Sequence, residues 1–126
     1  MRKLLLCIIL LITFVSHGQT MEFESKNIDY GIIKHNSDGH REFKFTNSGD
    51  KTLIINSAKG SCGCTIPSYK KEDGSNEWQP GESGTIKVKY ATNRIGVFTK
   101  NIVLLTNSNN HSPIILTITG EVIQKK

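Results

Sequence analysis

Apolar and polar residues alternate along most of the chain after Gln19, with a repeat of two. This repeat is typical of half-buried β-strands, whose successive side chains point to opposite faces, and no segment shows a helical repeat. Phe43 and Phe45 form one clear pair of expected inward positions. Ile28, Tyr30 and Ile32 are expected to share another inward face. The segments predicted as strands are 21–24, 28–32, 42–46, 53–55, 85–90, 98–106 and 114–122.

Turn-forming residues separate these segments, for example Asp38-Gly39, Asn47-Ser48-Gly49-Asp50 and Pro80-Gly81. Many short strands between turns, within about 100 residues, indicate an all-β fold. We expect an immunoglobulin-like antiparallel β-sandwich of about seven strands, and a partly open barrel is the alternative. The sequence has no internal repeat and no linker, so residues 19–126 are predicted to form a single domain.

The first eighteen residues have the order of a cleaved signal peptide. Arg2 and Lys3 precede an apolar run over residues 4–15, and a small residue, Gly18, follows at a suitable cleavage position. The run is short for a bilayer span, which favours a cleaved signal over an anchor. We therefore expect export, to the periplasm or outside the cell, with cleavage near Gly18.

The formal charge of +5 changes little about this picture. Cleavage would remove Arg2 and Lys3 and leave a formal charge of +3. The remaining cationic residues alternate with acids and are spread along the chain, unlike the clustered basic stripe of a nucleic-acid binder. We expect no nucleic-acid partner, and no stable membrane span because no second long apolar stretch exists.

Several motifs together resemble a known family. They are Ile28-Asp29-Tyr30-Gly31, Phe43-Lys44-Phe45-Thr46-Asn47-Ser48-Gly49, Ser61-Cys62-Gly63-Cys64-Thr65, Pro80-Gly81-Glu82-Ser83-Gly84, Ile86-Lys87-Val88 and Leu116-Thr117-Ile118-Thr119-Gly120-Glu121-Val122. Over residues 27–122 the chain resembles the domain-of-unknown-function family numbered fifteen seventy-three, which comprises small exported bacterial proteins. That family is similar to the immunoglobulin-like domains of the abnormal-spindle, hydin and major-sperm-protein group. The resemblance implies the sandwich and implies no activity.

Cys62 and Cys64 carry the one chemical hint in the sequence. In an extended strand two residues this far apart would have α-carbons roughly 6.6 Å apart, near the upper limit for a disulfide, and Gly63 lets the backbone bend. Three interpretations stay open: packed thiols or an inert local disulfide, a redox-active pair, or a soft-metal site for Cu(I) or Zn(II). Extra ligands for zinc would have to come from residues distant in sequence: His35, His40 and His111.

No phosphate-binding loop, nucleophile elbow or zinc-protease motif is present, so we expect no enzyme, although a catalytic set assembled by folding stays open. The preferred hypothesis is a non-catalytic module without a cofactor that binds a protein partner in the envelope or outside the cell. Its candidate contact residues are Ser61, Thr65, Tyr69 and Trp78, although Trp78 would alternatively cap the sandwich edge. The alternative function is a thiol protein that binds copper or exchanges disulfides through Cys62 and Cys64.

Overall fold

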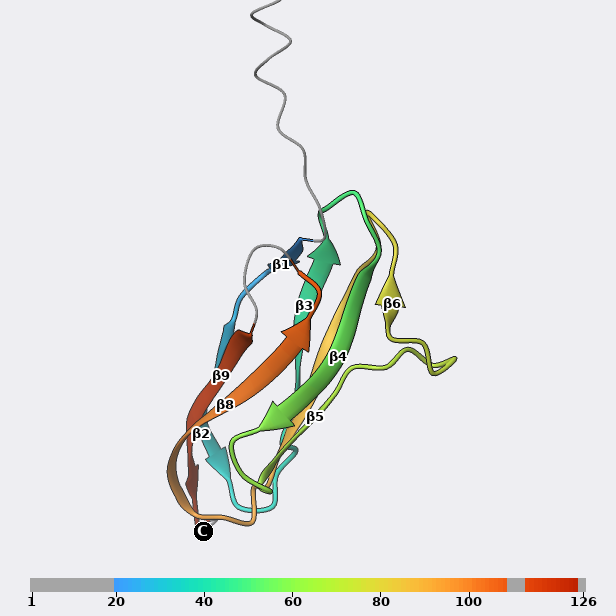
Figure 1. Ribbon diagram of the computed structural model, residues 1–126. Coiled ribbons are helices and arrows are strands. Elements are labelled where there is room, and N and C mark those ends of the chain that lie inside the picture. Colours follow the sequence, from blue (N-terminus) through green and yellow to red (C-terminus); the bar gives the residue numbers. More distant parts are fainter. Residues whose placement is uncertain (1–19, 109–112, 125–126) are drawn as a thin grey trace, which may run out of the picture.

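The alternating segments form strands in the computed structural model, which describes residues 20–108 and 113–124 (Figure 1). Over these ranges there are nine strands: β1 (Met21–Phe23), β2 (Asn27–Lys34), β3 (His40–Asn47), β4 (Leu53–Gly60), β5 (Thr65–Ser68), β6 (Glu77–Trp78), β7 (Ser83–Tyr90), β8 (Gly96–Thr106) and β9 (Ile114–Ile123). Seven of them match predicted segments. The sequence did not predict β5 and β6, which are too short to show a repeat. The predicted signal peptide over residues 1–18 lies outside the described residues.

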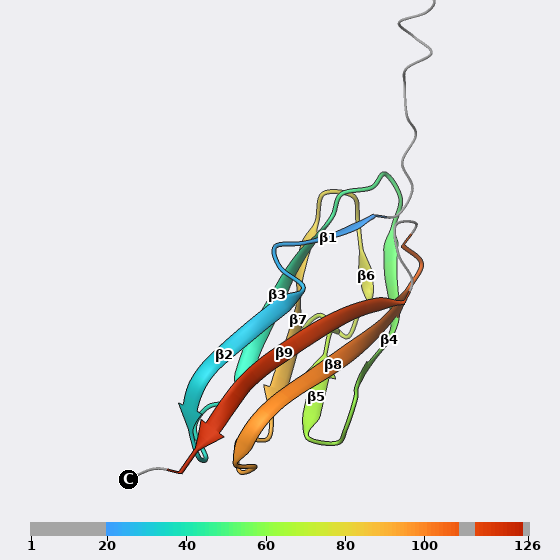
Figure 2. The same cartoon turned by 90° about the vertical axis from the view of Figure 1, so that its left-hand side faces the viewer.

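The strands form two sheets that pack face to face (Figure 2). One sheet has the order β1-β3-β7-β5, and the other has the order β2-β9-β8-β4-β6. Neighbouring strands in the described part of the chain run antiparallel, except that β2 runs parallel to β9. The expected immunoglobulin-like β-sandwich is therefore confirmed.

The core lies between the sheets and follows the alternation in the sequence. Phe43 and Phe45 are 1% and 2% exposed, as predicted. Burial of apolar surface at roughly 25 cal/mol per Å² is the main contribution that holds two sheets together. Fully buried side chains come from both layers, and the largest are Trp78, Phe43, Phe45, Met21, Leu53, Ile55, Ile86, Ile102, Leu104, Ile114, Leu116 and Ile118.

The prediction for Ile32 was wrong. Its side chain is 70% exposed, whereas Tyr30 is buried as expected. The register between β2 and β9 shifts between Asp29 and Ile32, and Gly31 has a φ of 71°. A bulge of this kind inserts one residue, so every side chain after it changes face. Ile33 therefore takes the inward position, and Ile32 points to solvent.

Asn47, at the end of β3, is a buried polar residue that joins several turns. Its Nδ2 donates to the carbonyls of Lys51 (2.8 Å) and Trp78 (2.9 Å), and its Oδ1 accepts the N–H of Gly49 (3.1 Å). Every polar atom of the side chain thus has a partner, which is what burial of an amide requires.

Replacement of Asn47 by Ala should lower the free energy of unfolding by about 2–4 kcal/mol, because two carbonyl groups lose their donor and each orphaned acceptor costs roughly 1–3 kcal/mol. Urea denaturation followed by tryptophan fluorescence measures this change. The matched control is Asn93→Ala at an exposed position, which should stay within about 0.5 kcal/mol of the wild type. Equal stabilities of the two variants would contradict the assignment.

Candidate functional site

The cysteine pair lies in the turn that carries the chain from β4 in one sheet to β5 in the other. The two sheets approach closely here, because a Cβ added to Gly60 would collide with the carbonyl oxygen of Thr65. Gly63 stands at the exposed tip, where a Cβ added to it would meet no atom within 4 Å. The turn is therefore tight at its base and open at its tip.

Cys62 and Cys64 form a disulfide, with their α-carbons 5.2 Å apart. This distance is shorter than in an extended strand, because the chain bends at Gly63 as expected. The backbone N–H of Cys64 donates to the Sγ of Cys62 at 3.3 Å. The hydroxyl of Thr65 lies 3.9 Å from the sulfur of Cys62 and 3.7 Å from that of Cys64. One backbone N–H and one hydroxyl thus lie beside the sulfurs.

The turn is also anchored to neighbouring strands by hydrogen bonds. The N–H of Ser61 donates to the carbonyl of Asn101 in β8 at 2.8 Å, and the hydroxyl of Ser61 accepts the N–H of Asn101 at 3.2 Å. The N–H of Ala91 donates to the carbonyl of Cys64 at 2.9 Å. Three hydrogen bonds therefore hold the turn in addition to the disulfide.

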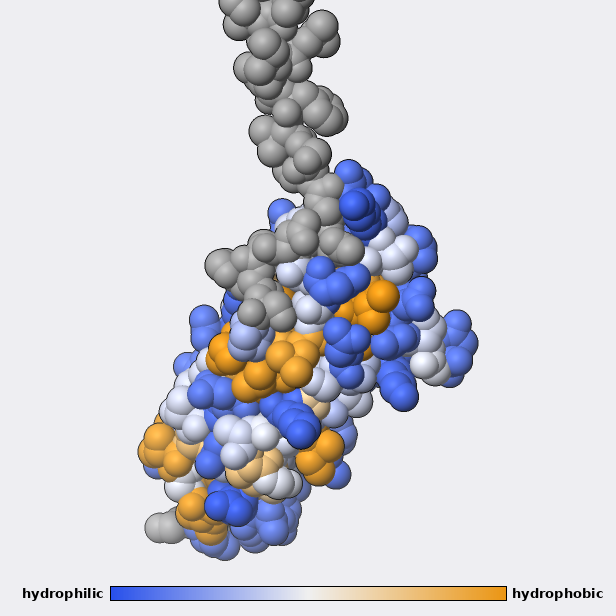
Figure 3. Space-filling model, viewed as in Figure 1, coloured by the Kyte–Doolittle hydropathy of each residue, from blue (hydrophilic) through white to orange (hydrophobic). Residues whose placement is uncertain are grey.

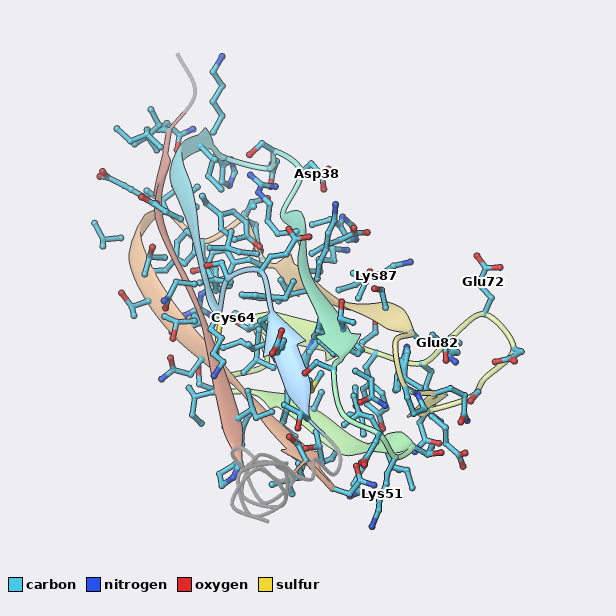
Figure 4. The ribbon with its side chains drawn as sticks, turned by 90° about the horizontal axis from the view of Figure 1, so that it is seen from above. Asp38, Lys51, Cys64, Glu72, Glu82 and Lys87 are labelled. Atoms are coloured by element: carbon cyan, nitrogen blue, oxygen red, sulfur yellow. A yellow bond between two sulfur atoms is a disulfide. The ribbon has the colours of Figure 1, made fainter. Side chains whose placement is uncertain are left out.

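A surface hollow of about 420 Å³ adjoins Cys64. One wall is the turn over residues 36–40, and the other consists of Ile66 and residues 89–93. These walls come from distant parts of the sequence. Figure 4 shows Cys64 among the strands and Asp38 at the periphery.

Hydrogen bonds hold the 36–40 turn, and the pKa values of two residues involved, Asp38 and Tyr30, are shifted. The carboxylate of Asp38 accepts the backbone N–H of His40 (2.9 Å) and contacts its Nδ1 (2.8 Å), and these hydrogen bonds lower the pKa of Asp38. The hydroxyl of Tyr30 donates to the carbonyl of Gly39 at 2.8 Å, and burial raises the pKa of Tyr30 to about 12. Tyr30 therefore stays neutral and keeps its donor at physiological pH.

The structure divides the four predicted contact residues into two kinds. Ser61 is exposed, and Tyr69 is half-buried with its hydroxyl 3.4 Å from the carbonyl of Asn56. Thr65 and Trp78 are each 2% exposed, so their side chains belong to the core. Trp78 thus packs inside, the alternative that the sequence left open. A contact role for this set stays a prediction.

The loop between β5 and β6 extends away from the sheets (Figure 4). Its base is held by Lys71, whose Nζ lies 2.7 Å from Oε2 of Glu82 and 5.2 Å from the centre of the Trp78 ring. The hydrogen bond from Lys71 lowers the pKa of the Glu82 carboxyl. Glu72 stands out in the loop, away from this ion pair.

Histidines do not join the cysteines in a metal site within the described ranges. His40 borders the same hollow as Cys64, but residues 20–108 and 113–124 contain no group of three or more histidine, cysteine, aspartate or glutamate side chains able to hold an ion. His111 lies outside the described residues. A Cu(I) or Zn(II) site stays a hypothesis for the two sulfurs.

Sequence reasoning missed an exposed apolar surface on the outer face of the five-stranded sheet. Ile32 and Val97, which are 70% and 78% exposed, flank Glu121 on three adjacent strands. Ile123, which is 40% exposed, follows on the same face of β9. Figure 3 shows the largest hydrophobic group over the upper ends of β8 and β9, and smaller separate groups near their lower ends. We call Ile32, Val97 and Ile123 the Ile32 patch; the signal for it was the glycine at position 31, which marks a bulge.

Two sheets in this arrangement define an immunoglobulin-like β-sandwich. The sequence profile of a family described as "protein of unknown function (DUF1573)" matches residues 21–122, and the chain belongs to this family. The family resemblance drawn from the motifs is therefore confirmed. No curated protein matches the chain. No helix in the described ranges is long and apolar enough to cross a membrane.

Solved structures with a similar fold share little sequence with this chain. A protein of unknown function from Porphyromonas gingivalis W83 is 14% identical, with a TM-score of 0.70 over 87% of this chain and 50% of that one. PapD-like domain 7 of human CEP192, an ASH domain, is 10% identical, with a TM-score of 0.63 over 86% of this chain and 88% of that one. A chain of the CsuC–CsuE chaperone–tip adhesion subunit complex of Acinetobacter baumannii is 11% identical, with a TM-score of 0.54 over 84% of this chain and 57% of that one. The chain thus spans about half the length of the first of these proteins.

Loss of the disulfide should lower the free energy of unfolding by only about 1.5 kcal/mol, because the bond closes a very short loop and restrains little of the unfolded chain. Guanidinium denaturation of the oxidised protein and of the Cys62→Ser, Cys64→Ser double variant measures this. A loss of about 4 kcal/mol or more, as for a long loop, would show that the bond holds the fold together.

Proposed function

We propose that this protein is an exported, non-catalytic immunoglobulin-like module that binds another protein through the edge of β2. The observation that carries the proposal is the exposed apolar Ile32 patch beside the longest free sheet edge. Exposed apolar groups that gather on one face of a protein commonly mark a contact surface.

The four sheet edges differ in what they offer to a partner. β1 and β6 have three and two residues. Along β5, the N–H of Thr65 donates to the carbonyl of Cys62, and Pro67 has no N–H. The outward positions of β5 therefore lack a free donor, which is a common protection of sheet edges.

β2 differs because it has eight residues and pairs on one side only. His35 donates its N–H to the carbonyl of Ile123, and bonded residues alternate along a parallel ladder. Ile32 and Lys34 therefore direct their N–H groups away from β9. An added strand would pair with these groups and place its own side chains beside Ile32, which is the β-augmentation mode of recognition.

The partner best suited to this edge is an extended segment with apolar side chains at alternate positions. Its side chains on the outer face would pack against Ile32, and a long cationic side chain would suit the carboxylate of Glu121 on the next strand. The bulge limits pairing to one half of β2, because the register shifts after Asp29. Likeness to chaperone structures supports protein binding as the class of function.

The binding test uses a photoreactive amino acid at position 32 on the β2 edge, in the full chain and in its native cells. We expect crosslinks to one protein from position 32, where Ile32 is 70% exposed, and none from position 66, where Ile66 is 60% exposed on the protected β5 edge. Ile32→Lys should weaken binding of the recovered partner by at least about ten-fold, because a charge replaces buried apolar area. Ile66→Lys is the matched control. Equal effects of the two variants, or crosslinks from position 66 alone, would exclude the β2 edge.

Export is proposed from the order of charged, apolar and small residues before Gln19. Mass spectrometry of the protein from the cell envelope should show a chain that begins at Gln19. A chain that keeps Met1 and stays in the cytosol would contradict export.

A further inference from the structure

We propose that Cys62 and Cys64 are a redox-active pair that exchanges its disulfide with thiols of another protein, with Cys62 as the sulfur that contacts the partner. This inference does not depend on binding at the β2 edge. It assigns a second, chemically distinct site to the domain.

The first support is the unequal burial of the two cysteines. Cys64 is 6% exposed and belongs to the core cluster, whereas Cys62 is only partly buried at its margin. Exchange requires in-line approach of an attacking sulfur, so access decides which sulfur reacts. An outer sulfur with an inner one behind it is the arrangement that lets the second cysteine release a bound partner.

The second support is the pair of donors at the outer sulfur. The N–H of Cys64 points to the Sγ of Cys62 at 3.3 Å, and the Thr65 hydroxyl lies 3.9 Å away. Donors of this kind stabilise a thiolate, which is the reactive form of cysteine. Since Thr65 is 2% exposed, its hydroxyl is held in place beside the sulfurs.

The third support is that the turn keeps its shape by other means. Ser61 is bonded to Asn101 through two hydrogen bonds, and the carbonyl of Cys64 accepts the N–H of Ala91. The sulfur–sulfur bond can therefore break and form again while the surrounding strands stay in place. A disulfide that closes so short a loop also contributes little to folding, which leaves chemistry as its main role.

The fourth support is the hollow of about 420 Å³ beside Cys64. Ile66 gives its wall an exposed apolar side chain, and Lys89 and Asp38 supply opposite charges on the two sides. Cys62 does not line this hollow, so a partner segment that rests there must extend past Cys64 for its thiol to meet the outer sulfur.

The exchange conserves atoms and electrons. In the reduced protein, the thiolate of Cys62 attacks a disulfide of the partner, forms a mixed disulfide and releases one partner thiolate, which takes up a proton. Cys64 then loses its proton and attacks the Sγ of Cys62. The second partner thiolate leaves, and the Cys62–Cys64 bond forms. Two electrons pass to the partner, and the reverse sequence oxidises a partner dithiol.

Oxidised glutathione serves as the test disulfide, with the full mature chain. Reduced Cys64→Ser should accumulate a mixed disulfide at Cys62, detected by mass spectrometry, at least about ten-fold faster than reduced Cys62→Ser forms one at Cys64. Wild-type protein should return to the internal disulfide without accumulating the mixed form. Equal rates in the two single variants, or a folded wild type whose disulfide resists dithiothreitol, would overturn the proposal.

Two further measurements separate a reactive site from a structural one. Mass spectrometry of reduced wild-type protein treated briefly with iodoacetamide should show alkylation first at Cys62, a result that requires no variant. Thr65→Val keeps the buried shape and removes the hydroxyl, so it should slow alkylation of Cys62 by about two- to five-fold. Ile32→Lys should leave the rate of mixed-disulfide formation and the rate of Cys62 alkylation unchanged. This control distinguishes failure of the cysteine site from failure of the β2 edge.

Discussion

Aromatic rings that lie over glycines determine how the two sheets meet. Phe45 in β3 faces Gly84 in β7, and Phe98 in β8 faces Gly120 in β9. In both places a Cβ on the glycine would collide with the ring beside it. The absent side chain therefore creates the space in which each ring lies, an arrangement known to stabilise glycine within sheets.

These rings in turn contact aromatic residues from the opposite sheet. Phe45 packs edge-on against Trp78, with ring centres 5.2 Å apart, and Phe98 stacks on Tyr90 at 3.9 Å. Gly84 and Tyr90 lie near opposite ends of β7, so one aromatic contact stands near each end of the sandwich. Aromatic pairs add to simple burial of area, and two separated contacts also fix the angle between the layers. The ring of Tyr30 packs edge-on against both rings of the second contact, and its hydroxyl bonds to Gly39 in the turn that forms one wall of the hollow.

The fold could be predicted from the sequence because its long strands alternate cleanly. Phe43, Phe45, Ile86 and Val88 are where period two places them. The same rule failed at Ile32, because one glycine reversed the alternation and a local repeat cannot detect an inserted residue. The two strands absent from the prediction are too short for any periodic signal. Their place is set by pairing with β4 and β7, which is a tertiary effect.

The candidate site could be predicted only in its local part. The spacing of Cys62 and Cys64, with glycine between them, was enough to indicate that the sulfurs could meet. The hollow could not be predicted, because its walls come from residues 36–40 and 89–93, and only the pairing of β3 with β7 brings these segments together. Burial of Trp78 also depended on a distant partner, the ring of Phe45.

The parallel pairing of β2 with β9 has a consequence for how the chain acquires its structure. An early strand can find its neighbour only after almost the whole polypeptide has been made, since residue 28 lies beside residue 118. Contacts so distant along the chain form slowly and late. During synthesis, β2 must therefore wait for β9, whereas every strand of the four-stranded sheet is complete by Tyr90. The five-stranded sheet gains its first strand only when the ten-residue β9 is present to join β2 to β8.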